Sequence, residues 1–296
     1  MTLPEEVRAG VLRYFGDGGR AWIEALPAVV AALGDRWSLT LGRSYGGGSH
    51  ALVLAVTRAD GTPAILKVPA RDDENADEAA ALRCYQGDGA SLLYDSDPGT
   101  GALLLERLEP GAPLRDHPDH DAAVDVACGL LRRLRRPVPS GHPFPLVREV
   151  VRRWTEGLRA FEARNPEALG WPEREESAST LRALAIPDGA EVLVNRDPNI
   201  GNVLSAQREP WLLIDPKPLV GEPAFDGGWL LVDLLRPAPD RVAATRLAEH
   251  VASGLGVPSD RVRAWAFVRA AQNARWELGS GGDPSVYRAI AAVLSA

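Results

Sequence analysis

The stretch VLVNRDPNIGN, residues 192–202, points most directly to the fold of this chain. It opens with apolar residues of high β-propensity, which predict a short strand. The strand leads into a polar turn that carries Asp197, and Asn202 follows five residues later. An aspartate and an asparagine at this spacing are common, so their meaning depends on the sequence around them.

A second apolar run, WLLIDPK at residues 211–217, delivers Asp215 thirteen residues after Asn202. Between the two runs, residues 203–204 continue a strand pattern and the polar residues 207–210 predict a turn. The sequence therefore predicts a hairpin that brings Asn202 and Asp215 together.

This combination is the one that phosphoryl transfer uses in kinases. Asp197 is the candidate catalytic residue, which accepts the proton of an acceptor hydroxyl or orients its oxygen. Asn202 and Asp215 are the candidate ligands of Mg²⁺. Little covalent chemistry falls to the protein in such a reaction, so catalysis consists of positioning and charge neutralisation. The expected phosphoryl donor is ATP or GTP.

Lys67, near the end of the apolar run 63–68, is the candidate ligand of the α- and β-phosphates. Glu78 follows it by eleven residues on a predicted helix and could orient its ammonium, and Glu74, one helical turn earlier, is the rival partner. A solvated surface lysine is the alternative interpretation. Because the chain has only two lysines among its 33 basic residues, a position that has kept one is more often a position where arginine cannot replace it.

A glycine-rich turn, residues 45–49, precedes this lysine between two predicted strands. The backbone N–H groups of Gly46, Gly47 and Ser49 could approach phosphate oxygens closely, because the glycines carry no side chain. A flexible β-hairpin loop has the same composition, and the motif alone does not separate the two interpretations.

The pattern along the chain predicts an α+β fold, with five strands and one principal helix followed by a mostly helical half. A helix with a kink or break at Pro27 is predicted at its start, and a boundary is predicted in the Pro- and Gly-rich segment 109–113. The predicted strands are 37–43, 51–57, 63–68, 91–95 and 102–106, with further short strands within 191–215, and the predicted helices are 20–33, 73–86, 121–135, 146–164 and those from 227 onward.

The run 209–226, EPWLLIDPKPLVGEPAFD, resembles the aminoglycoside phosphotransferases, most closely their streptomycin and hydroxyurea phosphotransferase branch. AILK at 64–67, LLLERL at 103–108 and QNARW at 272–276 support the resemblance, which extends from about Ala21 to Trp276.

The resemblance implies a two-lobed protein-kinase-like fold. Residues 1–108 would form the nucleotide-binding lobe, with a hinge near 106–110, and residues 111–296 would form a helical lobe with the catalytic loop and the acceptor site. The backbone around Glu106 and Leu108 would hold the purine. Asp226 would brace the catalytic loop, and the acceptor would be an aminoglycoside, with streptomycin first, or hydroxyurea or another metabolite.

The catalytic loop departs from the family pattern. The family loop usually reads His-Gly-Asp-Leu-His, and this chain has Asn195-Arg196-Asp197-Pro198-Asn199. The aspartate is retained, so activity is expected, and a nucleotide-binding pseudokinase is the alternative. An asparagine keeps hydrogen-bonding capacity but cannot titrate near neutral pH as histidine does.

The composition of the chain limits the classes of molecule that it is expected to bind. The net charge of −7 with no basic stripe disfavours nucleic acid and suits a cationic small molecule. No run is apolar enough for a membrane span, Cys84 and Cys128 form no disulfide framework, and the first residues lack the pattern of a signal peptide, so a cytoplasmic monomer or dimer is expected. Candidate acceptor-binding carboxylates are Asp226, Asp233, Glu277 and Asp283, and Trp276 is expected in the core rather than in the acceptor pocket.

Overall fold

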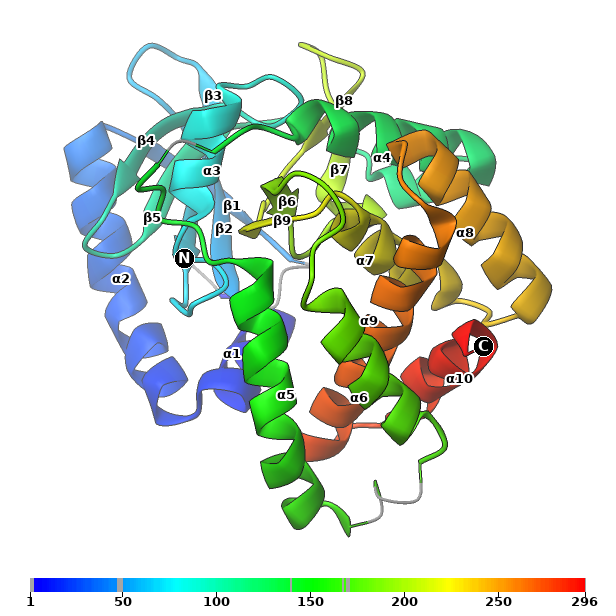
Figure 1. Ribbon diagram of the computed structural model, residues 1–296. Helices are drawn as coiled ribbons and strands as arrows, with labels where there is room; N and C mark the ends of the chain where they lie inside the picture. The colour runs from blue at the N-terminus through cyan, green and yellow to red at the C-terminus, as the bar shows by residue number, and fades with distance from the viewer. Residues whose placement is uncertain (1–2, 47–49, 139, 167, 169–170, 296) are drawn as a thin grey trace. The chain divides into compact units, whose positions relative to one another are not determined.

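The computed structural model describes residues 3–46, 50–138, 140–166, 168 and 171–295 (Figure 1). Contacts divide the chain into two compact units. Unit 1 comprises Met1–Gly111 with Ala206–Arg208, and unit 2 comprises Ala112–Ser205 with Glu209–Ala296.

Unit 1 is built on a five-stranded antiparallel sheet with the strand order β1-β2-β3-β5-β4. Its strands are β1 (Thr40–Tyr45), β2 (Ala51–Thr57), β3 (Pro63–Pro69), β4 (Leu93–Asp97) and β5 (Ala102–Glu106), and its helices are α1 (Glu5–Phe15), α2 (Asp17–Trp37) and α3 (Glu78–Tyr85).

The core of unit 1 lies between α2 and one face of this sheet. Leu26, Val30 and Leu33 of α2 pack in one cluster with Leu66 and Val68 of β3, and all five are buried. Side chains alternate between the two faces of a strand, so Lys67 points to the face opposite α2. The apolar pattern of β3 therefore determines which way the lysine points.

Several predicted boundaries in unit 1 are wrong. The helix does not break at Pro27: α2 continues through it, because the buried face on the following turns outweighs the hydrogen bond that proline cannot make. The strand predicted at 91–95 lies at Leu93–Asp97. The strand predicted from residue 37 begins at Thr40, since Trp37 ends α2. The helix predicted from 73 begins at Glu78, and the sequence analysis did not predict α1.

The late start of α3 has a local cause. The Oδ1 atom of Asp72 accepts hydrogen bonds from the backbone N–H groups of Glu74 and Asn75, both at 2.9 Å. A side chain that satisfies these donors competes with the first turn of a helix.

Unit 2 is mostly helical and carries two small antiparallel ribbons, β6 with β9 and β7 with β8. Its helices are α4 (His120–Leu134), α5 (Val147–Arg164), α6 (Glu173–Leu184), α7 (Ala224–Leu235), α8 (Arg241–Leu255), α9 (Ser259–Gly279) and α10 (Ser285–Leu294), with short 3₁₀ turns at Leu114–Asp116 and Ile200–Asn202. Its strands are β6 (Val192–Asn195), β7 (Val203–Ser205), β8 (Trp211–Leu213) and β9 (Pro218–Gly221). Of these elements, α6 and β9 were not predicted.

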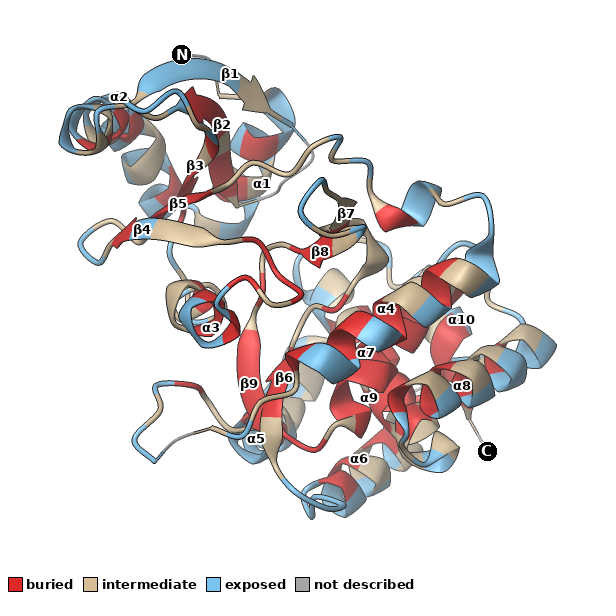
Figure 2. Ribbon diagram, turned by 90° about the horizontal axis from the view of Figure 1, so that it is seen from above, coloured by how far each residue is buried: buried red, intermediate tan, exposed pale blue. Residues whose placement is uncertain are grey.

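Helix α7 forms the core of unit 2 and is coloured as buried along most of its length in Figure 2. Phe225 and Trp229 of α7 stack with ring centroids 4.1 Å apart, and Trp265 of α9 meets both rings edge-on. At the crossing of the two helices, a Cβ atom on Gly228 would lie 2.8 Å from the backbone nitrogen of Ala266. The helices approach this closely because residue 228 has no side chain.

The α+β prediction is confirmed by these elements. Within the residues that the structure describes, no helix is long and apolar enough to cross a membrane.

The glycine at the α7–α9 crossing yields a test with a matched control. Gly228→Ala forces the backbone of α9 to move, and we expect it to destabilise unit 2 by about 1–3 kcal/mol. Gly129→Ala lies within α4, where a Cβ atom meets nothing within 4 Å, so there the better helix propensity of alanine should add about 0.5–1 kcal/mol. Urea denaturation measures the unfolding free energy of both variants. An increase in unfolding free energy for Gly228→Ala, of the same sign as that expected for Gly129→Ala, would contradict the close packing.

Candidate functional site

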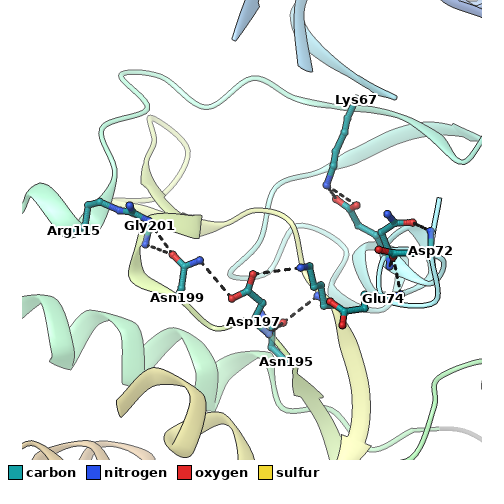
Figure 3. Close-up of polar contacts among 11 residues, drawn as sticks. Lys67, Asp72, Glu74, Arg115, Asn195, Asp197, Asn199 and Gly201 are labelled. Atoms are coloured by element: carbon teal, nitrogen blue, oxygen red, sulfur yellow. Dashed lines mark hydrogen bonds and ion pairs between the residues drawn. The ribbon is translucent and has the colours of Figure 1, made fainter. Parts of the chain in front are cut away.

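The Lys67 ammonium lies against the carboxylate of Glu78, the first residue of α3 (Figure 3). Its Nζ atom donates to Oε1 at 2.8 Å and to Oε2 at 2.6 Å. Of the two partners that the sequence allowed, the structure therefore pairs the lysine with Glu78. Glu74 lies in the turn before the helix, where its N–H bonds to Asp72.

Both charges of this pair are removed from water, with Lys67 8% and Glu78 1% exposed. Desolvating two charges costs several kcal/mol each, and the pairing repays this only in a good geometry such as this one. Replacing the ammonium alone would leave a buried carboxylate without its counter-charge. A buried ion pair of this kind is weak evidence for a role in stability, because apolar residues of the same volume often stabilise a core as well or better.

The side chain of Glu106, at the end of β5, is held by Arg208. The Arg208 Nε and Nη2 atoms donate to the two carboxylate oxygens at 3.0 and 2.9 Å, and its guanidinium also reaches the carbonyl oxygens of Gly87 and Ala90. The N–H of Leu92 donates to the same carboxylate at 3.0 Å. The carboxylate is thus engaged within unit 1. Sequence reasoning missed Arg208.

Leu108 lies two residues beyond β5, before a cis peptide bond at Glu109–Pro110. Its carbonyl oxygen would lie 2.9 Å from a Cβ atom at Gly111, whose φ is +76°. The turn after the predicted hinge therefore requires glycine on both grounds.

The glycine-rich turn is described only in part. Gly46 directly follows β1, and a Cβ atom there would meet the Oε1 atom of Glu6. Gly47 and Ser49 lie outside the described residues.

Asn195, the last residue of β6, links the segments on either side of it. Its Oδ1 atom accepts a hydrogen bond from the N–H of Asp197 at 3.1 Å and another from the N–H of Lys217 at 3.0 Å. The side chain is only 3% exposed. One buried amide oxygen therefore fixes Asp197 to the residues that follow β8.

Helix α7 braces the loop at both ends with carboxylates. Asp226 accepts from the N–H of Asn195 at 2.7 Å, and Asp233 accepts from the N–H of Ile200 at 3.1 Å. Burial raises the pKa of Asp226 to about 7, opposed by the bond from Asn195 and by the charge of Arg135. Burial also raises the pKa of Asp233, opposed first by the bond from Ile200.

Asn199 caps the turn that follows. Its Oδ1 atom accepts from the N–H of Gly201 at 2.7 Å and from Arg115 at 3.1 Å, and its Nδ2 atom lies 3.5 Å from Oδ1 of Asp197 (Figure 3). The amide oxygen thus caps the 3₁₀ turn Ile200–Asn202, a role for which asparagine is one of the preferred residues. Arg115, which sequence reasoning did not single out, covers Gly201 so closely that a Cβ atom there would overlap its guanidinium.

The predicted hairpin brings Asn202 and Asp215 to one end of the β7–β8 ribbon. The strands pair from Val203 with Leu213, and the N–H of Ile214 donates to the carbonyl of Asn202 at 2.8 Å. Asp215 has a φ of 52°, an uncommon conformation for a residue that is not glycine. Such strain often accompanies a side chain that must be aimed at a ligand.

An amide and a carboxylate oxygen suit Mg²⁺, which commonly takes one or two carboxylates and completes its shell with water and substrate phosphates. Within the residues that the structure describes, no group of three or more His, Cys, Asp or Glu side chains could hold a metal ion. The donor set of Asn202 and Asp215 fits an ion that arrives with phosphates.

A second lysine lies beside Asp197. The Nζ atom of Lys217 is 3.5 Å from the Oδ2 atom of that aspartate, an ion pair within unit 2. Asp197 thus has an amide near one carboxylate oxygen and an ammonium near the other.

The residues suggested as acceptor-binding have different surroundings in the structure. Asp226 and Asp233 are engaged by the loop, and Asp283 caps the start of α10 through Ser285. Trp276, expected in the core, is 49% exposed, because it lies on the outer face of α9 near the end of the helix. Glu277 is half-buried.

Several solved structures share this fold. The aminoglycoside phosphotransferase APH(4)-Ia, solved with ADP and hygromycin B, superposes with a TM-score of 0.65 at 13% identity, covering 89% of this chain and 97% of that one. Choline kinase LicA from Streptococcus pneumoniae superposes with a TM-score of 0.63 at 13% identity, covering 90% and 99%. At this identity the likeness establishes the protein-kinase-like fold that the sequence predicted.

Sequence comparison is more specific than the likeness of folds. The chain is 36% identical to the streptomycin 6-kinase of Streptomyces glaucescens over 96% of its own length and 94% of that protein, and 38% identical to the hydroxyurea phosphotransferase of Kitasatospora aureofaciens over 95% and 82%. Residues 36–281 match the model of the aminoglycoside/hydroxyurea antibiotic resistance kinases. This chain therefore belongs to the aminoglycoside/hydroxyurea antibiotic resistance kinase family and is an enzyme, a phosphotransferase with an alcohol group as acceptor.

Proposed function

We propose that the protein transfers the γ-phosphoryl group of ATP to a hydroxyl group of an aminoglycoside, with streptomycin as the first candidate. One observation carries the proposal. Asp197 stands on a loop held by Asn195 and Asn199, beside a hairpin end that presents Asn202 and Asp215. A fixed carboxylate next to a magnesium-type donor pair is what phosphoryl transfer to a hydroxyl needs.

In this proposal, residues 1–108 bind the nucleotide and residues 111–296 bind the acceptor. Lys67, oriented by Glu78, contacts the α- and β-phosphates. The backbone at Glu106 and Leu108 meets the purine, with the Glu106 side chain held back by Arg208. The backbone N–H of Gly46 contacts the phosphates, and Gly47 and Ser49 stay sequence-based candidates for the same role.

In unit 2, Asp197 accepts the hydrogen bond of the acceptor hydroxyl and takes its proton as the new bond to phosphorus forms. Asn195 holds the backbone N–H of Asp197 and Asn199 lies 3.5 Å from its carboxylate, so the base is positioned before the acceptor arrives. Asn202 and Asp215 would hold Mg²⁺, which supplies neutralisation of the phosphate charge when bound.

The acceptor is argued from the relatives and from charge. Streptomycin 6-kinases of two Streptomyces species are 36% and 34% identical to this chain. An aminoglycoside carries several positive charges, and a protein with a net charge of −7 attracts such a molecule. Hydroxyurea is the second candidate, because the relative that bears its name is 38% identical.

ADP release in the presence of Mg²⁺ and ATP tests the acceptor. We expect streptomycin to stimulate release at least about tenfold over a control without acceptor, and hydroxyurea and other aminoglycosides to do so less. A larger response to hydroxyurea would transfer the assignment to that acceptor. Nucleotide binding without turnover on any acceptor would favour a pseudokinase.

Asp197→Asn is the matched control for that assay. The amide keeps the size of the side chain and cannot take a proton, so turnover should fall by at least about 10²-fold, the usual lower bound for a positioned base. Binding of ADP, measured by calorimetry, should stay within about twofold. Equal turnover in parent and variant would remove Asp197 from the mechanism.

Lys67→Met separates the ligand role of the lysine from its stability effect. The single variant leaves Glu78 buried without its counter-charge and should lose about 3–5 kcal/mol of unfolding free energy. Lys67→Met with Glu78→Gln should recover most of that stability and none of the affinity for ATP. Recovery of ATP affinity in the double variant would mean that the lysine has only a structural role.

Asp215→Asn tests the metal assignment without disturbing the backbone, since asparagine tolerates the left-handed conformation found there. We expect kcat to fall and the Mg²⁺ concentration for half-maximal activity to rise at least about tenfold, with an unchanged melting temperature. An unchanged Mg²⁺ requirement would contradict the assignment.

A further inference from the structure

Lysine is used at only two positions of this chain, Lys67 and Lys217, among 33 basic residues. Arginine serves everywhere else, including in nearly all the ion pairs on the surface. Lys67 is paired with a buried carboxylate, in the place that phosphate binding requires. The other lysine, Lys217, has its Nζ atom 3.5 Å from the Oδ2 atom of Asp197. The presence of lysine at this position calls for an explanation of the same kind.

Hydrogen bonds hold the backbone of Lys217 at both its N–H and its carbonyl group. Its N–H donates to the Oδ1 atom of Asn195 at 3.0 Å, and its carbonyl accepts from the N–H of Arg196 at 2.7 Å. The same amide oxygen of Asn195 accepts from the N–H of Asp197. Lysine and aspartate therefore keep one relative position, set by a single buried side chain.

The contact between the two side chains is loose. A distance of 3.5 Å exceeds the 2.7–2.9 Å typical of a charge-assisted N–H···O bond, and the side chains are 22% and 31% exposed. Both side chains are partly exposed, so the ammonium is accessible to a negatively charged group.

We propose that Lys217 contacts the γ-phosphoryl group during transfer. The inference rests on the proposed function, in which the acceptor hydroxyl bonds to Asp197. A nucleophilic oxygen about 2.6–3.2 Å from that carboxylate, and about 3–3.5 Å from phosphorus, brings the γ-phosphoryl oxygens within reach of the ammonium after a small movement. In the step itself, the acceptor oxygen bonds to the γ-phosphorus, the bond from phosphorus to the bridging oxygen breaks, ADP leaves, and Asp197 takes the hydroxyl proton.

An ion pair alone is the competing explanation. An ammonium that only neutralises Asp197 would stabilise the loop equally whichever nucleotide is bound. An ammonium that contacts the γ-phosphoryl group distinguishes nucleotides that have this group from those that lack it. The two explanations therefore differ in a binding measurement that needs no turnover.

The experiment measures the affinities for ADP and for the imido analogue of ATP, both with Mg²⁺, together with kcat. The variants are Lys217→Met, which removes the charge, and Lys217→Arg, which keeps it on a bulkier group. Arg246→Met is the control: it also removes one positive charge from unit 2, from an exposed pair with Asp121.

For Lys217→Met we expect the affinity for the imido analogue to fall about five- to tenfold, the affinity for ADP to stay within twofold, and kcat to fall about 100-fold. Lys217→Arg should keep part of the preference for the analogue, and Arg246→Met should match the parent. Equal changes for the two nucleotides, or a kcat within threefold of the parent, would overturn the proposal. Since the parent and Asp197→Asn are measured in the same assay, a failure of the proposed function would appear there and not in this comparison.

Discussion

The hydrogen bond from the backbone N–H of Asn195 to the buried carboxylate of Asp226 is the constraint on which the site depends. It ties the end of β6 to α7, the most buried helix of unit 2. With its backbone fixed, the Asn195 amide can hold the N–H groups of Asp197 and Lys217 at once. Asp233, two helical turns along α7, holds the other end of the loop. One helix thus holds both ends of the loop that carries Asp197.

Burying a carboxylate opposes folding, and the raised pKa of Asp226 expresses that cost. The surrounding helix offsets it with apolar contacts. Phe225 and Trp229 stack, Trp265 meets both rings edge-on, and aromatic pairs add stabilisation beyond their buried area. The apolar residues at the neighbouring positions of α7 therefore offset the cost of burying the Asp226 carboxylate.

Much of the fold follows from local sequence. The strands of the sheet could be predicted because their apolar runs are bounded by turn residues, and the Asn202–Asp215 hairpin because two short runs flank a polar turn. The predictions of helix boundaries were wrong where side-chain contacts determine them. Hydrogen bonds to Asp72 delay the start of α3, and packing of the buried face lets α2 continue through Pro27.

In the site, residue types at known spacing could be predicted, but most of their partners could not. Glu78 was the expected partner of Lys67 with Glu74 as the rival, and the ion pair at the start of α3 confirms Glu78. Arg208 and Arg115 were missed, since one arginine among many gives no local signal and both act on residues more than 80 positions away.

The ion pair between Glu106 and Arg208 joins residues 102 positions apart, and it completes unit 1 with three residues taken from the later part of the chain. During synthesis at about 5–20 residues per second, Gly111 would be added about 5–20 s before Arg208. In the nascent chain, the sheet of unit 1 can form while the Glu106 carboxylate still faces water. The Glu106 carboxylate meets its guanidinium partner only when the β7–β8 turn has been translated, so unit 1 is completed by residues added long after its sheet.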